Sequence, residues 1–342
     1  MSVILKRNRI QYLDIAKGIA MLSVVIGHTV SPLRNFVYLY HLPVFFFVSG
    51  YLWHPKETYR AHVVSRLKAL YLPFVATGLM YCVASNLLYH LGCVDHVMTS
   101  KDLLKQLLRV VFFGGTSQSP IFGPMWFLRS LFLIDLIYFI LDRAIGGMLK
   151  LAIATYCLTL VGWVIKGDSG FIDTFLVIPL LALPLFFIGG VFRWYSLKIS
   201  TAMVLVGFGL LVAGMFVLRI DLSRLQVGHA FIYYPVSIIG VVVVIGSSEK
   251  LYNAMPRISS IFSFIGRHTI VILALHMFSM AALIQLLHHA GIDAGNVPNG
   301  IFGRSNWWIP LTIWGVVMPL MLAMGYRKAK DALKGFFAKP AR

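Results

Sequence analysis

Charged residues are scarce in this sequence, and acidic residues are the scarcest: 12 of the 342 residues are Asp or Glu, against 30 Lys and Arg. Charged residues make up 12% of the chain and hydrophobic residues 59%, whereas soluble domains contain about 25% and about 45–50%. So little charge excludes an ordinary soluble globular domain, because such a domain carries most of its charged side chains on its surface. The mean hydropathy of +0.82 indicates a chain whose solvent is a lipid bilayer.

Cysteine is scarce as well, and its three positions, Cys82, Cys93 and Cys157, are scattered along the chain. This spacing excludes a disulfide framework and provides no metal-binding motif, so we expect no metal ion and no tightly bound cofactor. The sequence also has no evident linker, low-complexity tract, internal repeat or cleavable signal peptide. It therefore predicts a single membrane domain over residues 1–342.

Apolar segments long enough to cross a bilayer recur along the chain, each near the ~20 residues that a transmembrane helix needs. The predicted spans are residues 12–31, 36–54, 67–91, 121–142, 149–165, 171–192, 201–218, 229–247, 268–288 and 307–326. The expected fold class is therefore an all-α integral membrane protein with about ten transmembrane helices. Apolar residues at helical spacing from Lys101 to Phe113 predict a short interfacial helix between the third and fourth spans.

The net charge of +18 is spread over short loops between the apolar spans, which argues against a nucleic-acid partner. With the N-terminus placed in the cytoplasm, 20 Lys and Arg fall in inside loops and tails and 8 in outside loops. Basic residues favour the cytoplasmic side of a membrane, so this asymmetry predicts that both termini are cytoplasmic.

The first span contains ionisable side chains that are costly in a bilayer, within the sequence YLDIAKGIAMLSVVIGHT. Lys17 and His28 are eleven residues apart, which places them on one face of a helix and about 16 Å apart along its axis. The second span runs in the opposite direction, so His41 is expected at the depth of His28, where the two rings flank one cavity near the outer surface. The alternative is that Lys17 reaches the headgroups and pairs with Asp14, while the histidines merely lie at an interface.

Further ionisable residues interrupt later spans. Arg129 and Asp135 lie six positions apart in the fourth span, so they do not share a helix face and each is expected to contact another helix. His276 lies near the middle of the ninth span, where a structural role and a cavity role are equally consistent with the sequence. A transporter or channel would use the same residues to line a solute path, although no pair of broken repeats supports that class.

At these residues the sequence resembles the membrane-bound acyltransferase-3 family of bacterial O-acyltransferases. In that family a basic residue, usually Arg, precedes a His by about three helical turns in the first helix, as Lys17 precedes His28. A second block, in which a His is followed by Pro, an aromatic run and Ser-Gly-Tyr, matches the segment from His41 to Tyr51. Weaker matches are GPMWFL, PLFFIGGVFRW and IGRHTIVILALH, and the neighbourhood of Lys17 is most similar to the fucose-4-O-acetylase-like branch.

The resemblance implies a multi-pass protein of the bacterial inner membrane. It implies transfer of an acyl group, with acetyl from cytoplasmic acetyl-CoA as the expected one, to a sugar hydroxyl of a surface polysaccharide, such as an O-antigen, or of its lipid-linked precursor. His28 and His41 are the implied catalytic residues, with His28 as general base or nucleophile. Lys17, Arg66 and Arg193 are expected to bind the donor's phosphates, although a Lys cannot make the bidentate contact of an Arg. Contacts to the oxyanion or to the carbohydrate acceptor are expected from Arg129, Asp135, His276 and Ser49.

Overall fold

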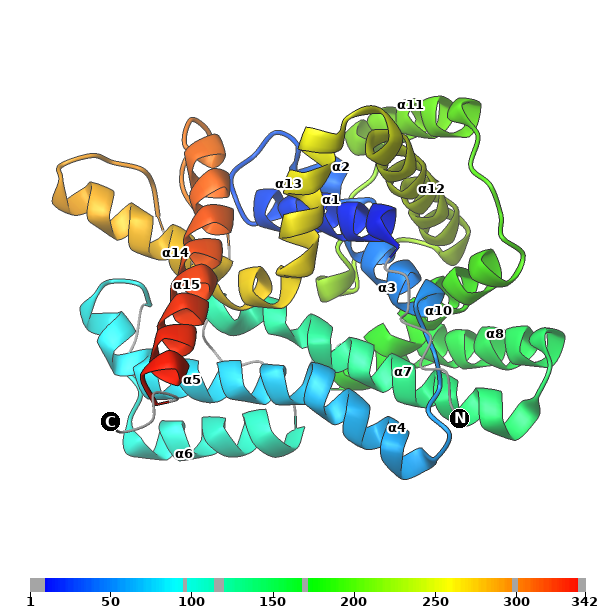
Figure 1. The fold of residues 1–342 in the computed structure, drawn as a ribbon, viewed down its shortest axis with the longest axis horizontal. Coiled ribbons are helices and arrows are strands. Elements are labelled where there is room, and N and C mark those ends of the chain that lie inside the picture. The colour runs from blue at the N-terminus through cyan, green and yellow to red at the C-terminus, as the bar shows by residue number, and fades with distance from the viewer. Residues whose placement is uncertain (1–9, 95–96, 114–119, 168–171, 297–300, 338–342) are drawn as a thin grey trace.

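The computed structural model describes residues 10–94, 97–113, 120–167, 172–296 and 301–337 (Figure 1). Within these ranges the chain is helical, and no β-strand is present beyond two isolated bridges. The helices are α1 (Gln11–Gly27), α2 (Arg34–Tyr38), α3 (His41–Tyr51), α4 (Tyr59–Arg66), α5 (Leu72–His90), α6 (Ser100–Leu108), α7 (Trp126–Ile145), α8 (Met148–Ile165), α10 (Ile178–Trp194), α11 (Thr201–Val217), α12 (Ala230–Ala254), α13 (Pro256–Arg267), α14 (Thr269–His289) and α15 (Trp308–Phe337). Short π-helical turns are Leu67–Tyr71, Arg109–Phe113 and Asp173–Val177, and 3-10 turns are Pro120–Met125 and Leu222–Arg224.

The fold class is the predicted one, an all-α integral membrane protein. In the described part of the chain, seven helical segments are long and apolar enough to cross a membrane. They are Tyr59–His90, Ile121–Ile145, Met148–Ile165, Phe175–Trp194, Ala230–Ala254, Thr269–His289 and Trp308–Ala332. Each overlaps a predicted span, and α11 matches the predicted span 201–218 as a shorter apolar helix.

The first two predicted spans are shorter in the structure. The helix predicted over residues 12–31 ends at Gly27. The helix predicted over residues 36–54 is divided into α2 and α3 by Tyr40, whose φ of −140° is not helical. Most side chains of α1 and α3 are buried. A break in a helix is tolerated at membrane depth when protein rather than lipid surrounds it, because neighbouring groups can then satisfy the backbone.

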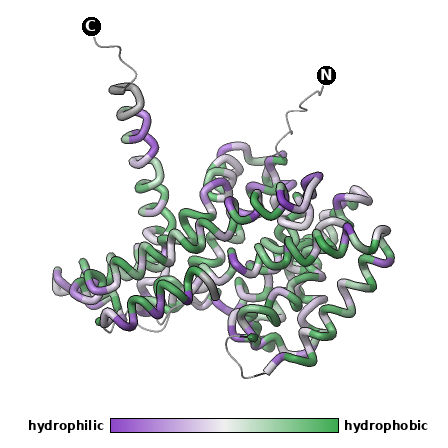
Figure 2. The backbone as a smooth tube through the Cα atoms, turned by 90° about the horizontal axis from the view of Figure 1, so that it is seen from below, coloured by the Kyte–Doolittle hydropathy of each residue, from purple (hydrophilic) through white to green (hydrophobic). Residues whose placement is uncertain are grey.

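The helices around α1 and α3 present apolar side chains outward. Only 22% of the most apolar stretch of Tyr59–His90 is buried, and the same share of Met148–Ile165. Phe231 of α12 is 92% exposed and Val164 of α8 is 83% exposed. Figure 2 shows hydrophobic residues along most of the helices. Apolar surface of this extent suits contact with lipid.

Glycines bring neighbouring helices into backbone contact with α1 and α3. A Cβ atom added to Gly18 of α1 would lie 2.0 Å from the carbonyl oxygen of Phe262 in α13. One added to Gly50 of α3 would lie 1.8 Å from the carbonyl oxygen of Phe186 in α10, and one on Gly189 of α10 would lie 2.1 Å from the backbone of α3. Small residues therefore determine how closely these helices approach.

Two amphipathic helices accompany the apolar ones. The helix predicted from Lys101 to Phe113 is confirmed, since α6 and the following turn Arg109–Phe113 cover that segment, and its place at a membrane interface stays a prediction. The sequence analysis predicts no helix over residues 256–267, yet α13 forms there with one apolar and one polar face. α13 lies beside α1 in Figure 1, and the pattern that identifies spans, a long apolar run, misses a helix with a polar face.

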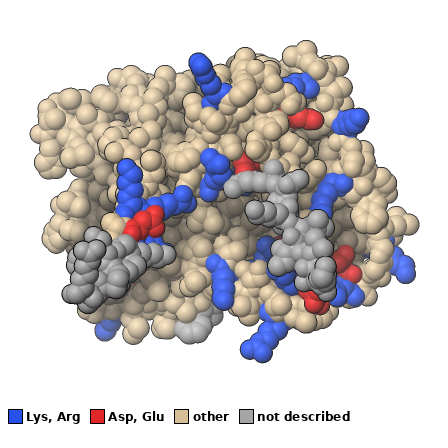
Figure 3. All heavy atoms as spheres, in the orientation of Figure 1, with Lys and Arg blue, Asp and Glu red and all other residues tan. Residues whose placement is uncertain are grey.

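The beginning of α1 and the end of α15 lie on the same side of the molecule, where α15 extends beyond the other helices (Figure 2). Figure 3 shows a face of the molecule on which Lys and Arg outnumber Asp and Glu. That the two termini share a side of the membrane stays a prediction, as does the assignment of that side to the cytoplasm.

Replacing Gly50 with Ala is expected to lower the stability of the purified protein by about 1–3 kcal/mol, because the added methyl group overlaps the backbone of α10. Gly209→Ala in α11 is the matched control, since a Cβ there meets nothing within 4 Å, and it is expected to be neutral or slightly stabilising. Thermal unfolding in detergent, followed by tryptophan fluorescence, measures both. Equal midpoints for the two variants would contradict a backbone contact at Gly50.

Candidate active site

A cavity of about 850 Å³ lies against α1, α3, the start of α7 and α14. α1 contributes Lys17, Met21 and Val24 to its wall, and His28, the residue that directly follows α1, continues this row. These residues recur at intervals of three and four, so one face of the helix lines the cavity over about three turns. The structure therefore brings the basic residue and the histidine of the first span to a single cavity.

α3 lines the same cavity and runs antiparallel to α1. His41, at its beginning, lines the same cavity as His28. Tyr51, at its end, hydrogen bonds to Tyr12 at the start of α1, with 3.2 Å between the hydroxyl oxygens. α1 and α3 are therefore antiparallel, and Ser49, which also lines the cavity, lies toward the Lys17 end, about 12 Å along the helix from His41.

His28 lies directly after the last residue of α1. Its backbone N–H donates to the carbonyl of Val25, and its own carbonyl accepts from the backbone N–H of Phe302 at 2.8 Å. Thr29 and Phe302 form an isolated parallel bridge. A loop from the far end of the chain thus fixes the backbone of His28 while its ring faces the cavity.

The ring of His41 is oriented by its own helix. Its Nδ1 lies 2.7 Å from the carbonyl oxygen of Val37, and a carbonyl can only accept, so Nδ1 carries the proton in the neutral ring. Nε2 of His41 then keeps its lone pair. The ring of Tyr38 contacts the imidazole edge to face, with 5.0 Å between ring centroids.

His276 of α14 lies behind His28 rather than in the cavity wall. The two ring centroids are 5.3 Å apart. Nδ1 of His276 lies 2.9 Å from the carbonyl oxygen of Ile272 and 3.0 Å from that of Leu273, so its Nε2 also keeps a lone pair. The ring is fully buried, and Nε2 has no hydrogen-bond partner among the described residues. His276 is therefore placed to support His28 and not to contact a substrate first.

Lys17 both lines the cavity and pairs with Asp14, the two arrangements that the sequence leaves open. Its side chain lines the cavity, and its Nζ forms an ion pair of 2.7 Å with the buried carboxylate of Asp14, one turn earlier in α1. The pair offsets the cost of burying either charge alone. It leaves the ammonium partly exposed, with donors available toward the cavity.

The end of the cavity beyond His28 is lined by polar residues that the sequence analysis does not single out. Arg34 and Tyr38 of α2 belong to this set, together with Asp221, Ser223 and Arg224 in the loop after α11. The sequence identifies a functional ionisable residue by its cost inside a transmembrane span, and a charged residue between two spans carries no such signal. The available signal is the rarity of acidic residues in this chain, which makes an Asp between two apolar helices unusual.

The weaker family-like blocks also meet around the cavity. Gly123 to Leu128 provide wall residues at the start of α7, and Thr269, Ile270 and Leu273 provide them at the start of α14. The block at the end of α10 packs its Gly189 against α3. Blocks that are distant in sequence thus build or support one site.

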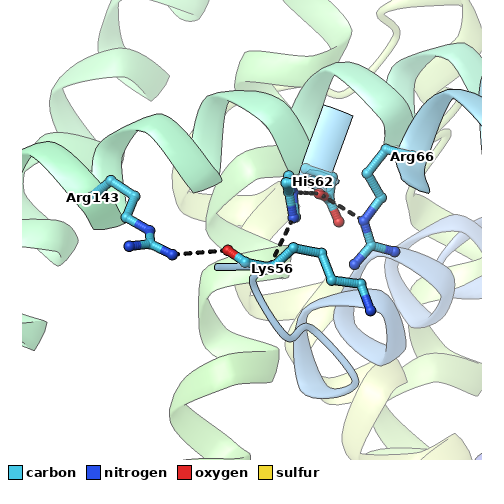
Figure 4. A network of polar contacts seen from close by, with 5 residues as sticks. Lys56, His62, Arg66 and Arg143 are labelled. Carbon is cyan, nitrogen blue, oxygen red and sulfur yellow. Dashed lines mark hydrogen bonds and ion pairs between the residues drawn. The ribbon is translucent and has the colours of Figure 1, made fainter. Parts of the chain in front are cut away.

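Asp135 and Arg66 lie elsewhere, which corrects their expected place in the site. Asp135 Oδ1 accepts a hydrogen bond of 2.6 Å from Nε2 of His62 and forms an ion pair of 3.1 Å with Nε of Arg66. His62 stacks on Phe139 with 3.9 Å between centroids. Figure 4 shows this network at the junction of α4 and α7. None of these residues lines the cavity, so the network joins helices and does not contact a substrate there.

Arg193 and Arg129 are also absent from the cavity wall. The Arg193 guanidinium donates to the carbonyl of Trp53 at 3.1 Å and contacts Nδ1 of His54 at 2.9 Å. It therefore holds the segment between α3 and α4, as Arg143 does by donating to two carbonyls of that segment (Figure 4). Arg129 is buried in α7 with its guanidinium 5.6 Å from the ring of Phe175.

An imidazole-lined cavity within a bundle of apolar helices is consistent with a polytopic membrane protein that has a polar site. A comparison with family models then identifies the class of chemistry. The model described as an acyltransferase domain matches residues 10–326. The chain therefore belongs to the acyltransferase-3 family and is a multi-pass membrane acyltransferase. No curated protein and no solved structure matches it significantly.

Replacing Asp135 with Ala is expected to lower the unfolding temperature, because Arg66 and His62 lose their acceptor at a buried position, at a cost of about 3–5 kcal/mol. Donor binding per folded molecule is expected to stay unchanged, since the network lies outside the cavity. Asp142→Ala, in the last two turns of α7, is the control for loss of a carboxylate. Thermal unfolding and titration with coenzyme A measure the two effects. If Asp135→Ala has normal stability but no longer binds coenzyme A, Asp135 belongs to the donor site after all.

Proposed function

We propose that this acyltransferase moves an acetyl group from cytoplasmic acetyl-CoA to a sugar hydroxyl of a surface polysaccharide or of its lipid-linked precursor. The observation that carries the proposal is the single cavity lined by Lys17 at one end and His28 about three turns away. Such a cavity suits two substrates that approach from opposite sides of a membrane. We further propose the bacterial inner membrane as its location, because there a cytoplasmic thioester faces an outer carbohydrate.

The donor is proposed to enter at the Lys17 end. Lys17 attracts the phosphates of coenzyme A as a point charge, and the pantetheine arm extends along α1 toward His28. Met21 and Val24 supply an apolar wall on the way, and Ser49 offers a hydroxyl on the facing helix. Arg66 and Arg193 are not included in this donor site because their guanidinium groups hold structural contacts.

His28 is proposed as the general base. Its imidazole takes the proton of the acceptor hydroxyl while the oxygen attacks the thioester carbonyl. The tetrahedral intermediate collapses by breaking the carbon–sulfur bond, and the imidazolium returns the proton to the departing thiolate. The products are the sugar ester and coenzyme A. A nucleophilic alternative, in which the acetyl group first bonds to His28, differs by a covalent acetyl-imidazole that forms before any acceptor is added.

His41 is proposed to bind the acceptor hydroxyl. Its Nδ1 proton is committed to the carbonyl of Val37, so the neutral ring offers a lone pair at Nε2 and no donor there. A group without a donor cannot stabilise the oxyanion of the intermediate. It can accept a hydrogen bond from a hydroxyl, which orients the acceptor beside His28.

His28→Ala is expected to reduce acetyl transfer by about a hundredfold or more, the contribution of a positioned general base. His289→Ala is the control, because that side chain is exposed at the end of α14 and does not line the cavity. The measurement uses purified protein, radiolabelled acetyl-CoA and a carbohydrate acceptor. Unchanged turnover in His28→Ala would end the catalytic assignment. Label retained on the wild-type protein without acceptor would instead support the acetyl-imidazole.

The double variant Asp14→Asn/Lys17→Gln is expected to weaken coenzyme A binding about tenfold, because a charged contact to phosphate is lost. Changing both residues avoids leaving the Asp14 carboxylate buried without its ion-pair partner. The double variant leaves the net charge of the protein unchanged, and Lys150→Gln, at an exposed position of α8, controls for the loss of a lysine away from the cavity. Calorimetric titration with coenzyme A in detergent gives the affinities. Equal affinity in the double variant and the wild type would remove Lys17 from the donor site.

A further inference from the structure

The cavity continues past His28 to an end with a different character. Here we group Arg34, Tyr38, Asp221, Ser223 and Arg224 as the mouth cluster, all of which line the cavity. The wall between the two ends is mostly apolar, whereas the mouth cluster contains two guanidinium groups, one carboxylate and two hydroxyls. A concentration of directed polar groups at one end of an apolar pocket is typical of a site that orients a ligand.

The loop after α11 holds its part of the cluster in a fixed conformation. Backbone hydrogen bonds join Asp221 and Gln226 in both directions, and Leu225 adopts a left-handed φ of 54°. Asp221 Oδ1 accepts from the backbone N–H of Ser223 at 3.0 Å and from its hydroxyl at 2.5 Å. A side chain tied to its own loop in this way is preorganised, so less ordering cost remains when a ligand binds.

α2 holds the other part. The guanidinium of Arg34 lies 5.1 Å from the centroid of the Tyr38 ring, and that ring also contacts the ring of His41. Gly27 makes room for Tyr38, since a Cβ there would lie 2.7 Å from a ring carbon. The mouth cluster is therefore continuous with His41, and through His41 with His28.

The charges of the cluster do not cancel. Asp221 is the only carboxylate in the cavity wall near Arg34 and Arg224 among the described residues, and its contact to Nε of Arg224 is long, at 3.7 Å. Each guanidinium has five N–H donors. Arg34 contacts the ring and the hydroxyl of Tyr38, and Arg224 contacts the distant carboxylate of Asp221, so these partners engage few of the donors. At the Lys17 end, in contrast, a close ion pair with Asp14 balances the charge.

We infer that the mouth cluster is the acceptor subsite and that it selects a glycan carrying an anionic group, a carboxylate or a phosphate. This inference rests on the proposed function. Arg34 and Arg224 grip the oxyanion, for which the guanidinium fork is suited. Asp221 and the Tyr38 hydroxyl contact neighbouring sugar hydroxyls, and the hydroxyl to be acetylated points inward to His41 and His28.

The test compares Arg34→Gln/Arg224→Gln with Arg219→Gln. Arg219 belongs to the same loop, but its guanidinium donates to the carbonyls of Met215 and Leu218 and does not line the cavity. The probes are methyl glucuronide, glucosyl phosphate and the neutral methyl glucoside, each as acceptor with acetyl-CoA. The wild type and Arg219→Gln are expected to prefer a charged probe about tenfold in kcat/KM. The double variant is expected to lose this preference through a higher KM, with kcat nearly unchanged, as for loss of ground-state binding.

A second measurement separates this inference from the proposed function. Thermal stabilisation by each probe is recorded without acetyl-CoA, so it reports the subsite even where no acetyl group is transferred. Stabilisation by a charged probe in the wild type and its loss in the double variant support the inference, and the stronger charged probe identifies carboxylate or phosphate. Equal stabilisation by charged and neutral probes, or by none, overturns it. If the double variant is no longer stabilised by coenzyme A but is still stabilised by the charged probe, the mouth cluster belongs to the donor site, and the inference is overturned as well.

Discussion

The close backbone contacts around α1 and α3 are the constraint on which the site depends. Between helices in lipid the hydrophobic effect contributes little, so association relies on packing, and glycines permit the closest packing. Gly18 lets α13 approach α1, and Gly50 with Gly189 lets α10 approach α3. The two central helices are therefore surrounded by protein. That enclosure makes the ionisable residues of α1 and the helix break at Tyr40 tolerable at membrane depth.

Buried charge in this protein is divided between two places with different roles. At the junction of α4 and α7, Asp135, His62 and Arg66 contact one another and fix two helices. In the cavity, Lys17 and Asp14 form a pair that stays partly exposed, and the imidazoles of His28 and His41 face open space. Full mutual satisfaction suits a structural network. The catalytic role that we propose for the cavity requires side chains that can contact substrates.

The sequence predicts the fold well where the signal is local. Apolar runs identify the helices that face lipid, because length and hydropathy suffice for that environment. They do not identify α13, whose polar face breaks the run, or the division of the second span at Tyr40, which tertiary burial makes possible. In the site, the cost of intramembrane ionisable groups and the spacing of Lys17 and His28 point to the cavity wall that the structure contains.

The cost of an ionisable group inside a span also led to the expectation, corrected by the structure, that Asp135 and Arg66 belong to the site. It applies equally to a structural ion pair, and the partners Asp135 and His62 are 73 residues apart, so no local pattern separates the two cases. The sequence does not identify the mouth cluster for the opposite reason, since Arg34 lies in the short helix α2 and Arg224 in a 3-10 turn, and neither residue interrupts a long apolar span. Only the folded arrangement of α2 beside the loop after α11 joins them.

The three histidines around the cavity differ in what orients them, and this difference bears on their roles. His41 and His276 each donate from Nδ1 to carbonyls one turn earlier, so their own segments set the ring direction and leave Nε2 as an acceptor. His28 follows the end of α1, and its backbone is held by Phe302 from the opposite end of the chain. Acyl transfer demands reacting atoms placed to within a fraction of an ångström. Because contacts among α1, α14 and the segment at Phe302 position His28, the proposed base would be competent only when the whole helical assembly is folded.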